Sequence, residues 1–227
     1  MPDRSQHDFK TTELNPGLLS TPFRVQTNWH VITGAPSCGK TTLINLLAAK
    51  GFQMVPEVAR QYMEREMARG RTIAEIHKNG AALQRSLVDM QLSIESGLRA
   101  IDVTFLDGAV PGSLAWYRAF GLNPNEILPE CFHHRYASVF ILDRLPLQLD
   151  GLRFEDDTLI SFLDEWITRD YRTLGYRVVR IPVLRPEERL AFVLERLSER
   201  GLLTYTDSGP ASISGGIALE DWGCIGM

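Results

Sequence analysis

The sequence contains little that would suit a secreted or membrane-embedded protein. Its 227 residues include three cysteines, Cys38, Cys131 and Cys224, which lie far apart and form no C-x-x-C pair. A disulfide framework or a zinc site is therefore not expected, and a reducing compartment is favoured. No run of 18 apolar residues occurs, and residues 1–13 lack the apolar core of a signal peptide. These absences predict a cytoplasmic protein without a transmembrane segment.

The chain also lacks a large excess of charge of either sign. The chain has 24 lysines and arginines against 28 aspartates and glutamates, which gives a net charge of −4. Such a balance provides no basic surface for duplex binding, so nucleic acid is not expected as a partner. The hydrophobic content of 44% is that of an ordinary globular domain, and the length suits one α/β domain with a substantial core.

Residues 34–41 stand out because they read GAPSCGKT, which fits the pattern G-x-x-x-x-G-K-[ST]. An apolar, β-rich run over 29–33 precedes them, and apolar residues at helical spacing follow. A strand before and a helix after this pattern are the context of a phosphate-binding loop. The predicted nucleotide-binding residues are Gly34, Ala35, Pro36, Ser37, Cys38, Gly39, Lys40, Thr41 and Thr42.

The chemistry of a phosphate explains this spacing. Glycines let successive backbone N–H groups turn toward a phosphate, which the N-terminus of the next helix also attracts. Lys40 can reach the β- and γ-phosphates, and the hydroxyl of Thr41 can hold Mg²⁺. A glycine-rich turn that merely caps a helix is the alternative, but a chance match in a chain of this length is only about one per cent. The electropositive loop also predicts an unusually acidic thiol at Cys38.

Strand-like and helix-like segments alternate along the chain. Such alternation predicts a parallel sheet with right-handed crossovers and helices on both faces. Strands are expected near 29–33, 52–55, 101–106, 137–142 and 177–183, with helices near 40–50, 57–67, 73–100, 111–120, 156–173 and 186–200.

Both ends of the chain lack such periodicity. Residues 1–26 are polar and punctuated by proline, and we expect a flexible arm on which a few apolar side chains could still dock. Residues 202–227 are rich in glycine and serine and are expected to form a tail. The nucleotide-binding domain is therefore predicted to span residues 27–201.

Polar residues follow each predicted strand, where an open parallel sheet binds its ligands. Glu57 and Arg60 follow the second strand, Asp107 the third, and Asp143 and Arg144 the fourth. Asp107 could hold Mg²⁺ or could cap the next helix. Glu57 could act as a general base toward a substrate hydroxyl, or could only stabilise a helix dipole. Arg60 could bind substrate, or could pair with Glu57.

The two arginine-bearing segments farther along the chain are open to two interpretations each. Arg144 and Arg153 lie in the loop 143–155, which could close over the phosphates or remain an exposed connection. Residues 185–189, with the sequence RPEER, begin the last predicted helix. They could lie near a nucleotide base or form a solvated helix face. His133 and His134 are expected on the surface.

Several stretches resemble the AAA-domain family of small P-loop ATPases and kinases, which includes the ribosylnicotinamide-kinase-like domain of NadR proteins. The resemblance covers residues 28–200 and rests on VITGAPSCGKTTLI, VPEVAR, FLDGAVPGSLAWY and VFILDRLP. It implies a three-layer P-loop NTPase fold with a five-stranded parallel sheet of order 2-3-1-4-5, as in nucleoside and nucleotide kinases. It also implies that Asp107 is the metal-side carboxylate, that Glu57 is the substrate-side acid, and that Arg144 and Arg153 belong to a lid. Relatives often carry an arginine after that aspartate, where this chain has Gly108.

Two functions are consistent with these features. The first is a Mg²⁺-dependent kinase that transfers the γ-phosphate of ATP to a small nucleoside-like hydroxyl compound, with Lys40, Glu57, Asp107, Arg144 and Arg153 as catalytic residues. The second is a regulatory ATPase or GTPase-like switch without a small acceptor. The choice between ATP and GTP, the acceptor and the oligomeric state are left open by the sequence.

Overall fold

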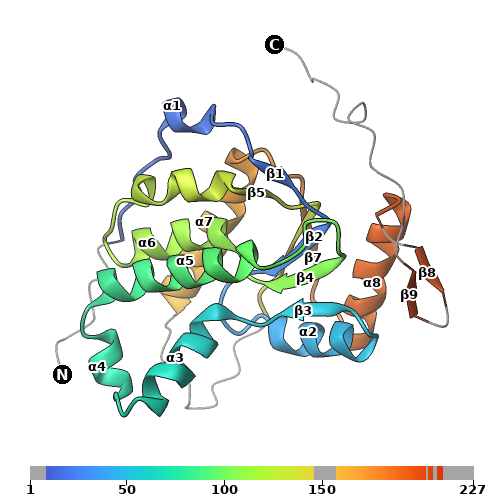
Figure 1. The fold of residues 1–227 in the computed structure, drawn as a ribbon, viewed down its shortest axis with the longest axis horizontal. Coiled ribbons are helices and arrows are strands. Elements are labelled where there is room, and N and C mark those ends of the chain that lie inside the picture. The colour runs from blue at the N-terminus through green and yellow to red at the C-terminus, as the bar shows by residue number, and fades with distance from the viewer. Residues whose placement is uncertain (1–8, 146–156, 203, 207–208, 212–227) are drawn as a thin grey trace.

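The computed structural model describes residues 9–145, 157–202, 204–206 and 209–211. Its centre is a five-stranded sheet in which all neighbouring strands are parallel. The strand order confirms the predicted 2-3-1-4-5 topology (Figure 1). Across the sheet the strands are β3 (Gln53–Val55), β4 (Thr104–Asp107), β2 (Trp29–Thr33), β6 (Ser138–Leu142) and β7 (Val178–Ile181).

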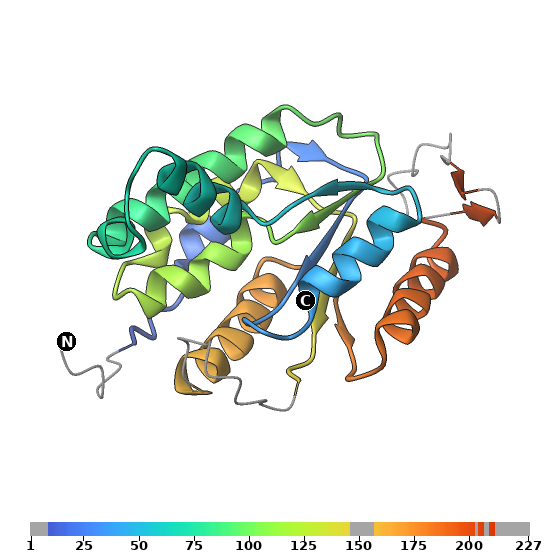
Figure 2. The ribbon, with the colours of Figure 1, turned by 90° about the horizontal axis from the view of Figure 1, so that it is seen from below.

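Helices cover both faces of this sheet, so the fold has the three layers that were predicted. One face packs against α2 (Lys40–Ala49) and α8 (Pro186–Glu199), which lie side by side in Figure 2. The other face packs against α5 (Gly80–Ser96), α6 (Ser113–Ala119) and α7 (Asp157–Thr173). Two shorter helices, α3 (Val58–Ala68) and α4 (Ile73–His77), pack against α5.

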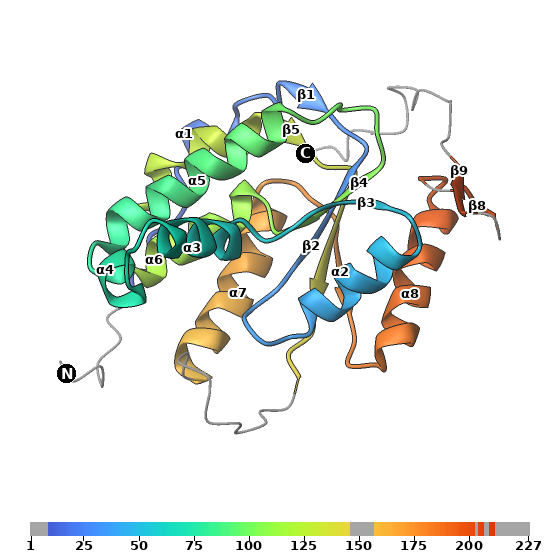
Figure 3. The same cartoon turned by 60° about the horizontal axis from the view of Figure 1, so that its bottom comes forward.

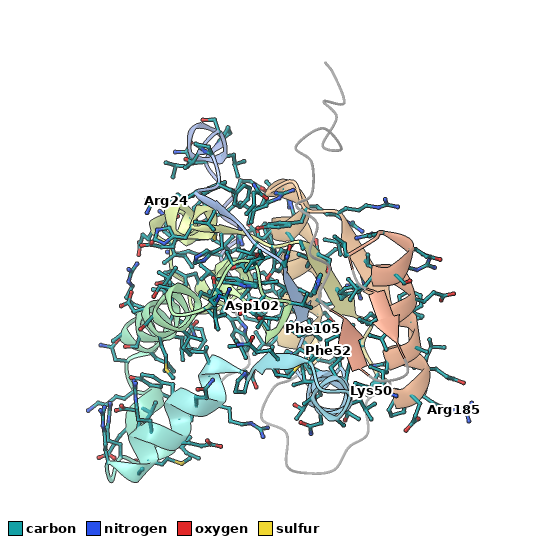
Figure 4. All side chains as sticks on the ribbon, turned by 45° about the vertical axis from the view of Figure 1, so that its right-hand side comes forward. Arg24, Lys50, Phe52, Asp102, Phe105 and Arg185 are labelled. Atoms are coloured by element: carbon teal, nitrogen blue, oxygen red, sulfur yellow. The ribbon has the colours of Figure 1, made fainter. Side chains whose placement is uncertain are left out.

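The central strand β2 is buried along its whole length, because sheet neighbours lie on both sides and helices above and below. Its side chains pack tightly with those of the next strands. His30 lies beside Phe105 of β4, and Phe105 packs edge to face on Phe52 with ring centroids 5.1 Å apart (Figure 4). The register pairs Ile32 with Asp107, which places the end of β4 beside the start of the phosphate loop.

Several predicted elements differ by one or two residues from the structure, and two differ by more. The helix expected over 73–100 is divided into α4 and α5, because Asn79 caps the second helix by accepting a hydrogen bond from the N–H of Ala82 at 3.0 Å. The third strand begins at Thr104 rather than at residue 101. Short 3₁₀ segments at Val110–Gly112, Pro124–Glu126 and Leu128–Phe132 complete the connections.

The flexible arm expected over residues 1–26 stays a prediction, but its described part, residues 9–26, docks on the domain through apolar side chains. A short helix α1 (Pro16–Leu19) is followed by β1 (Val25–Gln26), which pairs in parallel with β5 (His134–Arg135). Leu14 is buried in the main core, and Phe23 packs against it. These apolar contacts hold the segment against the domain, whose limits at 27 and 201 stay a prediction.

The arm is also tied to a buried ion pair. Nη1 of Arg118 in α6 lies 2.6 Å from Oδ2 of Asp170 in α7, and Nε of Arg118 donates to the carbonyl of Thr12.

In the expected tail, β8 (Thr204–Thr206) pairs antiparallel with β9 (Gly209–Ala211). No helix of the described ranges is long and apolar enough to span a membrane.

Candidate nucleotide-binding site

The loop between β2 and α2 has the backbone geometry that its glycines allow. Gly34 and Gly39 have φ values of 143° and 91°, and Ser37 has φ 63°, the one positive value at a non-glycine position in the described chain. A Cβ on Gly34 would lie 3.0 Å from Sγ of Cys38 and 3.1 Å from the carbonyl oxygen of Leu142. A side chain at Gly34 would therefore be strained and would crowd these two atoms, and the unusual conformation of Ser37 is of the kind that clusters at ligand sites.

The first turn of α2 opens toward this loop. Its N-cap is Gly39, which has a left-handed backbone and offers no side chain to the N–H groups of the first turn. Those N–H groups have no partner within the helix, and the helix dipole makes this end attractive to anions. Figure 3 shows the loop at the same end of the sheet as the starts of α7 and α8. This is the end at which parallel α/β sheets bind ligands.

Lys40 lies across the loop. Its Nζ donates to the carbonyls of Gly34 and Ala35, both at 3.0 Å. The ammonium is half-buried and has no carboxylate within ion-pair distance among the described residues. A positive charge held beside loop N–H groups is suited to polyphosphate, which would compete with the two carbonyls for the ammonium protons.

Asp107 lies at the end of β4, beside the root of the loop. Its carboxylate is 7% exposed, and Oδ1 has no hydrogen-bond partner in the described chain. The pKa of Asp107 is raised to about 6, chiefly by burial and also by the negative charge of Glu57, while the positive charges of Lys40 and Arg60 act in the opposite direction. These four side chains therefore share one electrostatic environment, as the strand-end argument led us to expect. Their chemical roles stay predictions.

The structure also bears on the purely structural alternatives for Asp107 and Glu57, which were a helix cap and the stabilisation of a helix dipole. The 3₁₀ segment after Asp107 has Ala109 as its N-cap and no side-chain capping bond, so Asp107 caps no helix. Glu57 precedes the first turn of α3 and is half-buried, and its side chain makes no capping hydrogen bond. Arg60 is exposed and forms no ion pair with Glu57 in the described ranges. Both carboxylates therefore remain available to a ligand or a cation.

Thr41 and Asp107 fit a magnesium ion. Thr41 is exposed on the first turn of α2, and Asp107 supplies an unpartnered buried carboxylate oxygen. No group of three or more His, Cys, Asp or Glu side chains in the described residues could hold a metal by itself. Mg²⁺ does not need such a group, since it is commonly held by one or two carboxylates together with substrate phosphates.

The residues after the fourth strand do not join this group. Asp143 accepts a hydrogen bond from Nε of Arg180 in β7 at 2.6 Å. Arg144 donates to Oγ of Ser161 at 2.7 Å and pairs with Asp157 at the start of α7. The edge strand and α7 thus engage both side chains, and Arg153 lies outside the described residues.

The structure reveals one residue whose position the sequence analysis missed. Arg189 of α8 is 3% exposed, and its Nη1 donates to the carbonyl oxygen of Cys38 at 2.6 Å. Arg185 pairs instead with Glu188 on the exposed first turn, as a solvated face would, and points away from the protein in Figure 4. The signal was present in the spacing, because Arg189 lies four residues before Val193 and therefore on the buried side of the helix.

Two smaller expectations are wrong. Cys38 is 1% exposed, and burial raises the pKa of its thiol although Lys40 and Arg189 lower it. Desolvation thus outweighs the positive charge of the loop. His134 is not a surface residue, since its Nδ1 lies 3.0 Å from Oε2 of the buried Glu95.

Comparison with known proteins identifies the family. A family model described as AAA domain matches residues 29–189, which is well over half of the chain and includes the loop, both acids and Arg189. The chain belongs to this family. No curated protein matches it in sequence.

Solved structures show the same fold at low identity. A NadR protein in complex with NR is 19% identical, with a TM-score of 0.55 over 76% of this chain and 51% of that one. The AAA-family chain thus spans about half the length of this NadR protein. A thymidylate kinase from Ehrlichia chaffeensis is 12% identical, with a TM-score of 0.53 over 75% and 97% of the two chains. One from Candida albicans is 11% identical, with a TM-score of 0.50 over 78% and 93%. The chain therefore has the fold of P-loop kinases.

Proposed function

We propose that this AAA-family chain is a Mg²⁺-dependent kinase that transfers the γ-phosphate of ATP to a hydroxyl group of a small nucleoside-like acceptor. The observation that carries the proposal is the common environment of Glu57, Asp107, Lys40 and Arg60 beside the phosphate loop. A site that only holds a nucleotide has no need of a second acid and an arginine at the next strand end. An acceptor that must be oriented and deprotonated does need them.

The donor side of the site would bind the polyphosphate. The N–H groups at the start of α2 and the ammonium of Lys40 would hold the β- and γ-phosphates. Thr41 and Asp107 would hold Mg²⁺, which when bound supplies charge neutralisation for the transferring group. Binding of a cation also relieves the unfavourable ionisation of Asp107, whose pKa is raised to about 6.

The acceptor side would be formed at the start of α3. Glu57 lies two residues after the end of β3, and β3 adjoins β4, so Glu57 and Asp107 come from neighbouring strand ends. It would accept a hydrogen bond from the attacking hydroxyl and take its proton. Arg60 is exposed one turn later on the same helix and would bind a polar group of the acceptor.

The names of the structural neighbours support a nucleoside-like acceptor. One is a NadR protein in complex with NR, another is a NadR protein in complex with NAD and AMP-PNP, and two are thymidylate kinases. Arg144 and Arg153 remain our candidates for closing over the phosphates. Arg144 would have to release Ser161 and Asp157 to do so.

The test follows labelled phosphate from ATP into a product. The full chain with Mg²⁺ and γ-labelled ATP or GTP would be offered a panel of nucleosides and cofactor precursors. We expect the label in a phosphorylated acceptor, and we expect Glu57→Gln to reduce this transfer at least a hundredfold while nucleotide binding is preserved, as removal of a general base does. Glu64→Gln is the matched control, because Glu64 is an exposed glutamate of the same helix.

The contrary result is equally specific. If label appears only as free phosphate with every acceptor, and Glu57→Gln has no effect on its release, the chain is a hydrolase or switch rather than a kinase. The proposed acceptor site would then be abandoned.

A further inference from the structure

Arg189 is a buried cation, and most of its N–H donors have no hydrogen-bond acceptor among the described residues. Its Nη1 donates to the carbonyl oxygen of Cys38 at 2.6 Å, but Nε and Nη2 are buried without a hydrogen-bond partner in the described chain. No carboxylate of the described residues forms an ion pair with it. A buried arginine normally has a paired acid, so this arrangement calls for an explanation.

The packing of α8 fixes where this guanidinium lies. Leu190, Val193 and Leu197 of α8 belong to the same buried cluster as Leu43 and Leu47 of α2. This contact places α8 against α2. Arg189, in the first turn of α8, then reaches the loop that precedes α2. A Cβ on Gly39 would lie only 3.1 Å from Nη1, so the loop and the guanidinium are in direct contact.

The bond to Cys38 has a consequence for the next residue. The peptide unit that joins Cys38 to Gly39 is planar and trans, so its C=O and its N–H point in opposite directions. A carbonyl that is held toward Arg189 therefore turns the N–H of Gly39 away from Arg189. Because Gly39 has φ 91° and no Cβ, other backbone conformations are accessible to it, and the hydrogen bond from Arg189 favours this one.

The missing counter-charge points to an anion. An uncompensated buried charge is costly, and the cost is recovered when an opposite charge binds close by. The loop that Arg189 contacts is the one whose N–H groups and lysine are arranged for phosphate. A polyphosphate in the loop would thus be the counter-charge that the described residues do not supply.

We propose that Arg189 is a positioning residue of the phosphate loop, which orients the Cys38–Gly39 peptide and contributes a buried positive charge that nucleotide binding compensates. The proposal rests on the nucleotide binding of the proposed function but not on phosphoryl transfer. A purely structural role, a staple between α8 and the loop, makes different predictions. It would make Arg189 important for folding and irrelevant to the affinity for nucleotide.

The experiment compares the full chain with Arg189→Met, Arg189→Lys and the control Arg196→Met, which removes a half-buried arginine of the same helix that pairs with Glu199. The affinities for Mg-ATP and for inorganic tripolyphosphate are measured by calorimetry, and thermal unfolding is followed with and without each ligand. We expect Arg189→Met to weaken both ligands about tenfold or more, since hydrogen bonds and charges that act on a bound anion are lost. Its unfolding temperature without ligand should be unchanged or higher, because an uncompensated buried charge is removed. Arg189→Lys should fold and bind with intermediate affinity, and Arg196→Met should behave as the unmodified chain.

Three results would overturn the proposal. If the unmodified chain binds Mg-ATP and Arg189→Met binds it equally well, the positioning role is wrong while the proposed function stands. If Arg189→Met unfolds at lower temperature but keeps the full stabilisation by ligand, and Arg189→Lys binds normally, Arg189 is only a staple. If the unmodified chain binds neither ligand, both proposals fail. Loss of tripolyphosphate binding in Arg189→Met would support the role even if no acceptor is ever phosphorylated.

Discussion

Glu57 and Asp107 are two carboxylates from neighbouring strand ends, and the negative charge of Glu57 helps to raise the pKa of Asp107 to about 6 after the larger effect of burial. The two acids belong to segments fifty residues apart in sequence, and the pairing of β3 with β4 brings them together. Like charges that are held close and partly desolvated are unfavourable unless a cation joins them. Lys40, Arg60 and a bound Mg²⁺ are the cations that this site can offer or accept.

Asp107→Asn should therefore stabilise the ligand-free protein and weaken its Mg²⁺-dependent binding of nucleotide. At pH 7 the ionised Asp107 costs up to about 3 kcal/mol, which is the shift from 3.8 to about 6 expressed as free energy. Urea unfolding at pH 7 should show the variant to be more stable, while the dependence of nucleotide binding on Mg²⁺ should be lost. A variant that is less stable at pH 7, or that keeps its Mg²⁺ dependence, would contradict this role.

The pH dependence of stability gives the same prediction a second readout. Because the pKa of Asp107 is higher in the folded state, the folded protein holds this proton more tightly than the unfolded chain does. Its contribution to stability is thus greatest below about pH 4 and falls as the pH rises to about 6. The difference in unfolding free energy between the variant and the unmodified chain should grow over this range and stay constant above it.

Lys40→Ala should abolish nucleotide binding without unfolding the domain. Among the described residues, Nζ of Lys40 donates hydrogen bonds to two loop carbonyls and to the thiol of Cys38, so the variant loses contacts within the loop rather than in the core. Direct titration with Mg-ATP should show affinity reduced at least a hundredfold, since the cation proposed to contact the phosphates is gone. Lys50→Ala at the far end of the same helix is the matched control. An unchanged affinity in Lys40→Ala would contradict the assignment of the loop.

Gly34→Ala should combine a loss of stability with a loss of nucleotide binding. A Cβ there would approach the Leu142 carbonyl at 3.1 Å, and φ is 143°. Overpacking of this kind costs about 1–3 kcal/mol, which denaturant unfolding can resolve. Gly108→Ala separates the two causes, because Gly108 also has a positive φ of 84° but no atom within 4 Å of the added Cβ. Equal losses of stability in the two variants would show that contact with Leu142 has no effect.

His30 should make the protein sensitive to acid. Burial lowers its pKa from 6.5 to about 3, and its Nε2 has no partner in the described chain. Because the unfolded chain binds this proton more readily, stability is lost as the pH falls below about 6.5, by about 2 kcal/mol at pH 5. His30→Gln should retain a hydrogen bond to Ser138, which now lies 2.7 Å from Nδ1, and should lose part of this pH dependence in thermal unfolding between pH 5 and 8. An identical pH dependence in the variant would show that His30 does not titrate on unfolding.

The sequence determined the features of this protein that depend on local pattern. The glycines and lysine of residues 34–40 can be recognised because a phosphate loop needs fixed residue types at fixed spacing. The strands around Trp29 and Ser138 could be located from their apolar runs, and the resemblance to a known family then supplied the sheet order. Asp107 and Glu57 could be chosen as partners because the ends of parallel strands meet at one edge of the sheet.

Only the tertiary structure decided which of several similar residues lie against the loop and which are exposed or paired elsewhere. Arg189 and Arg185 lie four residues apart in one charged motif, yet packing of α8 on α2 buries the first and leaves the second exposed. Asp143 follows its strand as Asp107 does, but Arg180 of the edge strand neutralises it. Burial and charge pairing depend on contacts between residues far apart in sequence, and these contacts exist only after the layers have packed.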